Sequence, residues 1–129
     1  MRVQKIGCIE LVSNWKHWVC VFPQHGPGPK HERSIVLAPW QTDLVHAWPA
    51  RFAAGLIDSD GCRVMNQVQH RRYAYPRYMF TNVSPEIRAL FGLACDLLGV
   101  KWRQANRHNL SVARRESVAI LDMHVGPKR

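Results

Sequence analysis

The sequence predicts an α+β fold of order αββαββα from about residue 50 onward, preceded by an extra N-terminal β-hairpin. Three observations predict this class. Apolar residues recur at the spacing of an amphipathic helix from Ile87 to Leu98. They alternate with polar residues after Gly61, as in a half-buried strand. Short segments rich in Asn, Gly and Pro separate such runs and mark turns.

Residues 1–38 are predicted to form an N-terminal segment ahead of the main domain, residues 39–129. Apolar runs at 6–12 and 15–22 indicate two short strands, with Ser13-Asn14 as the turn between them. Residues 23–30 hold too many Pro and Gly for regular structure, so they are predicted to be a loop.

Two helices are predicted to open the main domain. Pro39 suits the first turn of a helix that runs to about Ala47. Pro49 ends that helix and introduces a second one, from Ala50 to about Asp58.

Two hairpins and two further helices complete the order. The first hairpin pairs residues 61–69 with 77–83 across a turn at 70–76. Ser84 begins a helix as its N-cap, and Gly99 ends it. The second hairpin pairs residues 100–104 with 110–114, and a last helix covers 115–123.

The composition indicates a folded, basic chain. Its 129 residues suit one domain, and 47% are hydrophobic, enough to bury a core. Lys and Arg number 18 against 9 Asp and Glu, a formal net charge of +9. Such a small domain matches a polyanion, most often nucleic acid. Charge alone also fits a ribosomal protein or a basic soluble protein of another kind.

The basic residues cluster in two blocks without acids, one between Asp60 and Glu86 and one between Asp96 and Glu116. They are Arg63, Arg71, Arg72, Arg77, Lys101, Arg103, Arg107, Arg114 and Arg115. Two such blocks predict one positive surface built from two separate segments.

Nothing in the sequence predicts a membrane protein. No apolar run approaches the roughly 20 residues that a span needs, and no signal peptide is recognisable. We therefore expect a cytoplasmic protein without a membrane partner. Its four cysteines, Cys8, Cys20, Cys62 and Cys95, are expected to be reduced thiols.

Residues 53–61 read Ala-Ala-Gly-Leu-Ile-Asp-Ser-Asp-Gly. This segment resembles the LAGLIDADG signature of homing endonucleases at seven of nine positions, departing at Ala53 and Ser59. The flanking order of elements is similar to that family's αββαββα fold, so the resemblance covers about residues 50–128. It implies an antiparallel sheet that binds double-stranded DNA, and metal-dependent cleavage of that DNA.

The small residues of the motif have a physical reason. Ala53, Ala54 and Gly55 would let two such helices approach with their backbones almost in contact. Leu56 and Ile57 are expected to point into each unit's own core.

The acidic residues are expected to have separate roles. Asp58 would accept backbone hydrogen bonds and fix the turn after the helix, which Gly61 permits. Asp60 would project at the foot of the paired helices. Two such acids, one per helix, could hold Mg²⁺ or another divalent cation against a phosphodiester.

The resemblance also implies further site residues. Asp60 would be the catalytic metal-binding acid, and Ser59 would offer its backbone carbonyl to the metal. Asn82, in a Thr-Asn pair that resembles the family's Thr-Gln pair, would support the water network. Lys128 corresponds to the family's lysine after the last helix.

The first strand of the main sheet is predicted to read DNA bases. Its outward set would be Arg63, Met65, Gln67 and Gln69. Arg suits guanine and Gln suits adenine in the major groove. The other basic residues would divide between bases and phosphates, and a register slip of one residue would exchange the two faces.

One motif supplies half of such a site. The resemblance therefore implies a homodimer or a second LAGLIDADG unit. Residues 22–30 echo residues 123–128, so residues 1–30 resemble the tail of a preceding unit, with Lys30 in the place of Lys128.

Three alternatives remain open on the sequence. A transcription regulator built on the same fold would bind DNA without cutting it. An RNA maturase would use the fold on RNA. Cys8, Cys20, His25 and His31 could form a zinc set, although the CxxC spacing typical of such sites is missing.

Overall fold

The computed structural model of the chain describes residues 2–4, 8–10, 14, 16, 34–67 and 74–125, and of residues 2–4, 8–10, 66 and 67 the backbone alone. The helices are α2 (Pro39–Ala47), α3 (Pro49–Asp60), α4 (Pro85–Leu98) and α5 (Arg115–His124). The strands are β1 (Arg2–Gln4), β2 (Cys8–Glu10), β3 (Gly61–Gln67), β4 (Ala74–Thr81), β5 (Arg103–Gln104) and β6 (Asn109–Val112).

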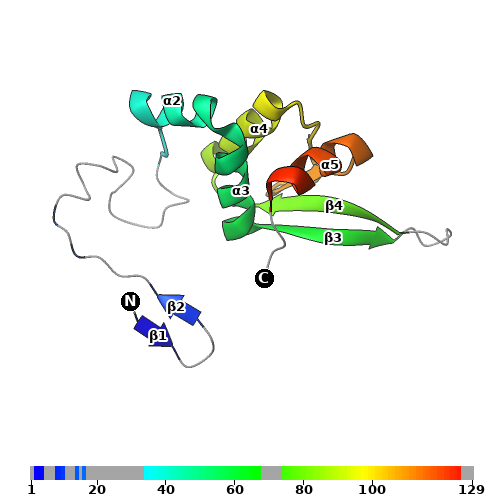
Figure 1. Cartoon of the computed structure of the whole chain (residues 1–129), viewed down its shortest axis with the longest axis horizontal. Helices are drawn as coiled ribbons and strands as arrows, with labels where there is room; N and C mark the ends of the chain where they lie inside the picture. The colour runs from blue at the N-terminus through cyan, green and yellow to red at the C-terminus, as the bar shows by residue number, and fades with distance from the viewer. Residues whose placement is uncertain are drawn as a thin grey trace.

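The main architecture is a four-stranded antiparallel sheet of order β3-β4-β6-β5 with helices packed on it. Helices α3, α4 and α5 lie on one side of the sheet (Figure 1). The predicted α+β class is confirmed, and the elements from α3 to α5 follow the predicted order. In the described part of the chain no helix covers the other side, which we call the open face.

Helix α4 begins and ends as predicted. The Ser84 hydroxyl accepts a hydrogen bond from the Ile87 backbone N–H at 3.3 Å, which satisfies one of the free donors of the first turn. Pro85 occupies the first helical position. Gly99 adopts a φ of 73°, a left-handed conformation that glycine reaches without steric cost.

The hydrophobic core lies between this sheet and the three helices. The rings of Phe80 on β4 and Phe91 on α4 are stacked, with their centroids 4.5 Å apart. Ile57 of α3 and Leu121 of α5 are buried in the same cluster. One residue from each helix therefore meets the same face of β4.

Strand boundaries differ from the prediction. Ala74 to Pro76 were expected in a turn but belong to β4, and the second hairpin is shorter than predicted. A proline is tolerated in β4 because β6 pairs only with Tyr78 to Thr81, so Pro76 lies where that side of β4 is an edge.

An N-terminal hairpin is present, but its pairing differs from the prediction. Strand β2 falls within the predicted first strand, and its partner is β1, which the sequence did not predict as a strand. Ser13 of the predicted turn and all of the second predicted strand except residue 16 lie outside the described residues.

None of the helices described is both long enough and apolar enough to cross a lipid bilayer. Two of the four cysteines have described side chains, Cys62 and Cys95, and both are free thiols as expected. Burial raises the pKa of the Cys95 thiol to about 12.

Candidate functional site

Two of the predicted catalytic residues meet at the foot of α3. The Asn82 side-chain amide donates a hydrogen bond to Oδ2 of Asp60 at 3.0 Å. The meeting follows from the hairpin, because Asp60 precedes β3 and Asn82 follows β4, at the same end of the strand pair (Figure 1). The two side chains therefore lie together, as their predicted roles at one metal site would require.

The orientation of the Asn82 amide is fixed by a second contact. Its Oδ1 accepts a hydrogen bond from the Ser84 backbone N–H at 2.8 Å. The oxygen is thereby engaged, so the Nδ2 group must be the one that faces Asp60. Asn82 is buried, and Asp60 is half-buried, so the carboxylate remains partly open to solvent.

Arg88 and His108 hold the Asn82 backbone, and no pattern in the sequence indicated either residue. The Arg88 guanidinium donates to the carbonyl oxygens of Asn82 at 2.7 Å and of Val83 at 3.0 Å. The carbonyl of His108 accepts from the Asn82 N–H at 3.0 Å. These partners lie on α4 and in the β5–β6 turn, so only the tertiary fold brings them together.

A single carboxylate marks the candidate metal site. Ser59 and Asn82 both donate to Oδ2 of Asp60, and no described residue donates to Oδ1. Within the described ranges no group of three or more His, Cys, Asp or Glu side chains could hold a metal. Mg²⁺ in proteins is commonly held by one or two carboxylates together with water and substrate phosphate. The donor set therefore fits a shared Mg²⁺ site but not a closed one.

The Ser59 side chain makes contacts within α3, and Asp58 differs from its predicted role. The Ser59 hydroxyl donates to the Leu56 carbonyl at 2.9 Å and to Asp60 at 3.3 Å. Helix α3 continues two residues beyond its predicted end, which places Asp58 inside the helix rather than at the turn. Asp58 is exposed, and its carboxylate accepts no hydrogen bond from the described residues, so its predicted turn-fixing role is wrong.

Gly61 is required for a reason other than the predicted one. Its φ is −108° and its ψ 170°, an extended conformation open to any residue. A Cβ at this position would lie 2.9 Å from the Cα of Ile57. Gly61 therefore allows β3 to start directly against the backbone of α3.

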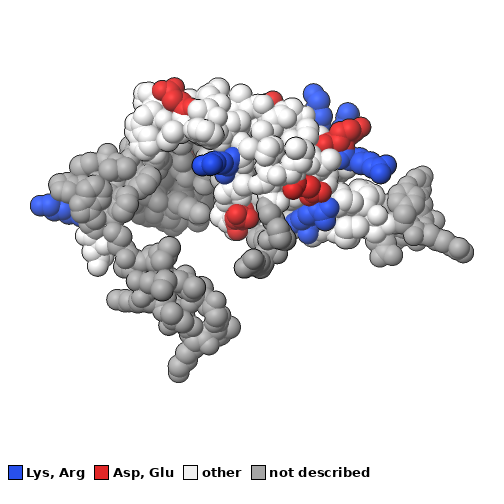
Figure 2. All heavy atoms as spheres, viewed as in Figure 1, with Lys and Arg blue, Asp and Glu red and all other residues white. Residues whose placement is uncertain are grey.

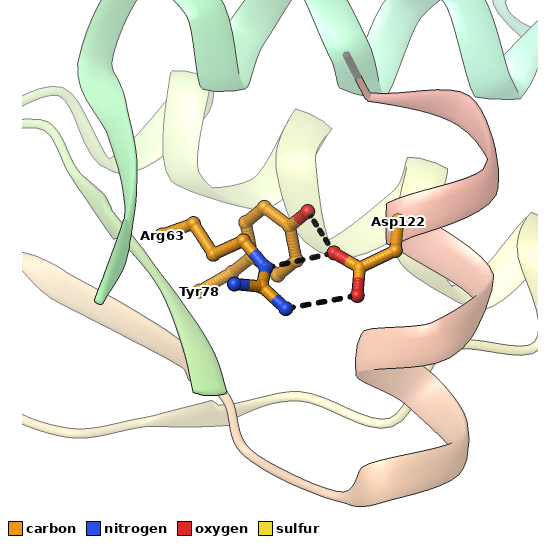
Figure 3. Close-up of polar contacts among 3 residues, drawn as sticks. All are labelled: Arg63, Tyr78 and Asp122. Atoms are coloured by element: carbon orange, nitrogen blue, oxygen red, sulfur yellow. Dashed lines mark hydrogen bonds and ion pairs between the residues drawn. The ribbon is translucent and has the colours of Figure 1, made fainter. Parts of the chain in front are cut away.

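Arg63 does not lie on the open face. Its guanidinium forms two hydrogen bonds with the Asp122 carboxylate on α5, at 2.9 and 3.1 Å (Figure 3). The Tyr78 hydroxyl donates to the same carboxylate at 2.5 Å. The hydrogen bond from Arg63 holds the pKa of Asp122 below its usual 3.8. Burial, reinforced by Asp122, raises the pKa of Tyr78 to about 12.

The outward set predicted for β3 is therefore wrong by one residue. Residues directly opposite in an antiparallel pair share a face. Arg63 lies opposite Tyr78, which is buried under the helices, and Met65 lies two residues further along the same face. Cys62 and Val64 belong to the open face instead. A buried tyrosine opposite Arg63 decides the register, and the alternation within β3 alone could not show it.

Among the residues whose side chains are described, the open face holds no acid. Strand pairing assigns to it Cys62, Val64, Tyr75, Arg77, Met79, Thr81, Arg103, Asn109 and Ser111. Two arginines and a mixture of polar and apolar side chains therefore line the side of the sheet that lacks described helices. Thr81 and Asn109, opposite one another, are joined by a side-chain hydrogen bond.

The remaining basic residues divide between the two sides. Lys101, Arg103 and Arg114 line a hollow at the β5–β6 edge, and Arg107 lies exposed in the β5–β6 turn. Arg115 borders a different hollow that it shares with Asp122, on the side of the helices. The predicted side chains of Gln67, Gln69, Arg71, Arg72 and Lys128 lie outside the described residues, as do those of the four-residue zinc alternative.

The helix side of the molecule carries mixed charge. In Figure 2 basic side chains gather near α5, with acidic ones among them. Arg63 and Asp122 are one such pair. The contrast with the acid-free open face shows that the net charge of +9 is unevenly distributed.

One face of α3 has no partner among the described residues. Ala53 and Ile57 are buried in the core, as predicted for Ile57 but not for Ala53, and Ala54 is half-buried against it. Gly55 is exposed, and a Cβ there would meet nothing within 4 Å. The predicted small-residue contact surface is therefore reduced to Gly55.

An apolar groove continues that unpartnered face. It has a volume of about 450 Å³ and is lined mainly by Leu37, Trp40, Leu44, Val45, Trp48 and Phe52. Trp48 and Phe52 occupy the turns before Gly55 on the same side of the helix. Trp40, Leu44 and Trp48 are each about half exposed. Large apolar side chains that are exposed together in this way are unusual on the surface of a monomer. We call Gly55 and this groove the pairing face.

Comparisons of the chain with protein-family models, with curated proteins and with solved structures found no match. The fold and the site define an α+β domain with an open antiparallel face and one buttressed carboxylate at its end. Further assignment has to rest on this geometry and on the residue chemistry.

Proposed function

We propose that the chain binds double-stranded DNA on the open face of its sheet. We further propose that it cleaves a phosphodiester with Mg²⁺ when two units meet, as a LAGLIDADG homing endonuclease does. The observation that carries this proposal is the acid-free open face, which has a solvent-accessible carboxylate, Asp60, at the end where β3 begins.

The open face suits a nucleic-acid backbone. Arg77 and Arg103 lie on it, and Lys101 and Arg114 flank its edge, without an acid to repel phosphate. A two-stranded ribbon fits the major groove of B-DNA, which is about 12 Å wide. Asn109 offers an amide group of the kind that contacts adenine.

Asp60 would hold the metal through Oδ1, to which no residue of the described ranges donates. Asn82 binds Oδ2 and fixes the plane of the carboxylate, so Asn82 is a positioning residue. A bound Mg²⁺ would neutralise charge on the scissile phosphate. The carbonyl of Ser59, in the last turn of α3, is a second oxygen near this end of the helix.

A second unit would supply the missing acid. The pairing face is apolar and lacks a side chain at Gly55. It extends along α3, the helix that ends at Asp60. Two copies joined through this face would bring their α3 helices together and place two Asp60 residues at the same end. We take the second copy of this chain as the partner.

The test is incubation with a randomised duplex-DNA library and Mg²⁺, followed by sequencing of cut ends. The parent and Asp60→Asn are compared, with Asp43→Asn as a control that removes an exposed acid on α2. We expect discrete ends from the parent and from Asp43→Asn, and none from Asp60→Asn.

Two other outcomes have clear meanings. Salt-dependent binding by all three proteins without ends would contradict cleavage and favour a non-catalytic DNA-binding module. Tighter binding to folded RNA than to duplex DNA, measured in the same assay, would contradict the DNA proposal and favour an RNA partner.

A further inference from the structure

Two hydrogen-bond donors on the open face are buried without an acceptor. They are Oγ of Ser111 on β6 and Nε of Arg77 on β4, and neither has a partner among the described residues. Ser111 is only 1% exposed, so its hydroxyl does not form a hydrogen bond with bulk water. Buried polar groups are almost always hydrogen-bonded, so two orphan donors in one region require an explanation.

The two donors are neighbours on the same face. Ser111 lies directly opposite Met79, and Arg77 precedes Met79 by two residues in β4. Such diagonal positions have Cα atoms roughly 7–8 Å apart, within reach of a long side chain. Both groups carry an N–H or O–H, and an anion with several oxygens would accept from both.

Ser111 also lines a basic hollow of about 270 Å³. The other lining residues are Lys101, Trp102, Arg103, Ala113 and Arg114. Three of these side chains are cationic and none of the lining residues is acidic. Continuing the β4–β6 register by one residue places Arg77 opposite Ala113, at the wall of the hollow.

The surrounding fold holds in place the backbone that carries Lys101 and Arg103. The Trp102 indole donates to Asp96 on α4 at 2.9 Å, and its ring would touch any Cβ added at Gly92. In extended backbone the residues before and after Trp102 point to the opposite side. The Lys101 N–H is fixed by the Ser117 hydroxyl at 2.8 Å. Lys101 and Arg103 are thereby directed away from α4.

We propose that this hollow is a seat for one backbone phosphate of bound DNA, with Ser111 and Arg77 donating hydrogen bonds and Arg103, Arg114 and Lys101 supplying charge. The inference rests on the proposed DNA binding and assigns four of its basic residues to a phosphate rather than to bases. Contacts of this kind position a protein on the duplex without reading its sequence.

The first experiment tests the seat without DNA. Inorganic phosphate is titrated into the protein while the backbone amide signals of Ser111 and Ala113 are followed by NMR, with sodium chloride at equal ionic strength as the reference. We expect a saturable shift that Arg103→Gln and Arg114→Gln weaken. Arg115→Gln is the matched control, because it removes the same charge one residue away on the helix side.

The second experiment measures DNA affinity against salt. Each phosphate contact contributes about 0.9 to the slope of log K against log salt. Arg103→Gln and Arg114→Gln should each lower the slope by up to that amount. The double variant should not exceed it, because both act on one phosphate. Arg115→Gln should leave the slope unchanged.

Ser111→Ala separates binding from folding. Removing an unsatisfied buried hydroxyl should keep or raise the Tm of the free protein while weakening phosphate binding about three- to tenfold, the worth of one hydrogen bond. Ser84→Ala is the control, since that buried serine caps α4 and its loss should lower the Tm.

The outcomes are distinguishable. No phosphate-specific shift and unchanged slopes, in a protein that binds DNA, would overturn the seat and leave DNA binding standing. A phosphate shift with unchanged DNA slopes would overturn the DNA backbone as its ligand in favour of free phosphate. Absence of DNA binding by the parent would overturn the proposed function, and the DNA seat with it.

Discussion

Gly55 and Gly61 belong to the same short motif, yet their missing side chains have different consequences. At Gly61 the backbone of Ile57 fills the space that a Cβ would need. At Gly55 that space is open on the exposed side of α3. Gly61 allows close packing within the domain. Gly55 leaves space on its surface for another helix to approach.

We therefore predict opposite effects of alanine at the two positions. Gly61→Ala should lower the free energy of unfolding by about 1–3 kcal/mol, because a backbone contact at 2.9 Å cannot relax without moving β3 from α3. Gly55→Ala should raise it by about 0.5–1 kcal/mol, the usual cost of glycine inside a helix. Urea unfolding measures both, and equal effects would contradict the assignment.

Some site residues can be predicted from the sequence, and others depend on the tertiary fold. Asp60 and Asn82 could be predicted as a pair, because each adjoins the end of a strand in one hairpin. Arg88 and Ser111 could not, since their roles depend on which elements pack beside them. Local turns and caps are encoded nearby, whereas these contacts join segments far apart in the chain.

At the scale of elements, the triad of Arg63, Tyr78 and Asp122 joins the last helix to the sheet (Figure 3). Helix α5 is short and its N-cap residue makes no side-chain hydrogen bond, so little in its own sequence fixes it. The carboxylate accepts from two different strands and anchors the exposed side of α5. Leu121 anchors the other side in the core.

The triad should make stability depend on pH at both ends. Asp122 has a lowered pKa, so its contribution is present above 3.8 and is lost as pH falls through the lower folded value. Tyr78 has a raised pKa, so its contribution is present below 10.0 and is lost as pH rises towards about 12. The stabilised window lies between those limits.

Asp122→Asn should therefore destabilise the protein by about 1 kcal/mol at neutral pH, a modest figure because the side chains of Arg63 and Asp122 are 41% and 38% exposed. The difference from the parent should shrink as pH falls below 3.8. Urea unfolding followed by circular dichroism measures it, with Asp43→Asn as the control. A difference that stays constant with pH would contradict the triad's role.

Elements differ in how well the sequence predicts them. Helix α4 was predicted from Ser84 to Gly99 because its caps are local. The outward face of β3 was wrong, because alternation defines two faces but not which one the helices cover. Burial of Tyr78 and Phe80 on the neighbouring strand decides it.

At the scale of the whole molecule, the domain has two surfaces of contrasting chemistry. Among the described residues, the open face carries two arginines and no acid, and the pairing face is apolar and includes Gly55. If the proposal is correct, the first binds DNA and the second binds another copy. Under the same proposal, the two faces together would complete the metal site.

Association should therefore depend on the size of residue 55. Gly55→Leu should prevent pairing, because its side chain would fill the space where a partner helix approaches, while the monomer keeps its fold. Sedimentation velocity over a range of concentrations measures the effect, and circular dichroism checks the fold. A monomeric parent, or a Gly55→Leu variant that still pairs, would contradict pairing through α3.

The register of β3 also matters to anyone who would retarget such a domain by directed evolution. A library randomised at Arg63 and Met65 would vary the side of the sheet that supports α5. It would weaken the fold without varying the proposed recognition surface. If DNA binds on the open face, a library at Cys62, Val64 and Met79 would vary that surface without touching the contacts to α5. A shift of one position along a strand decides whether a library varies the proposed recognition surface or the support of the last helix.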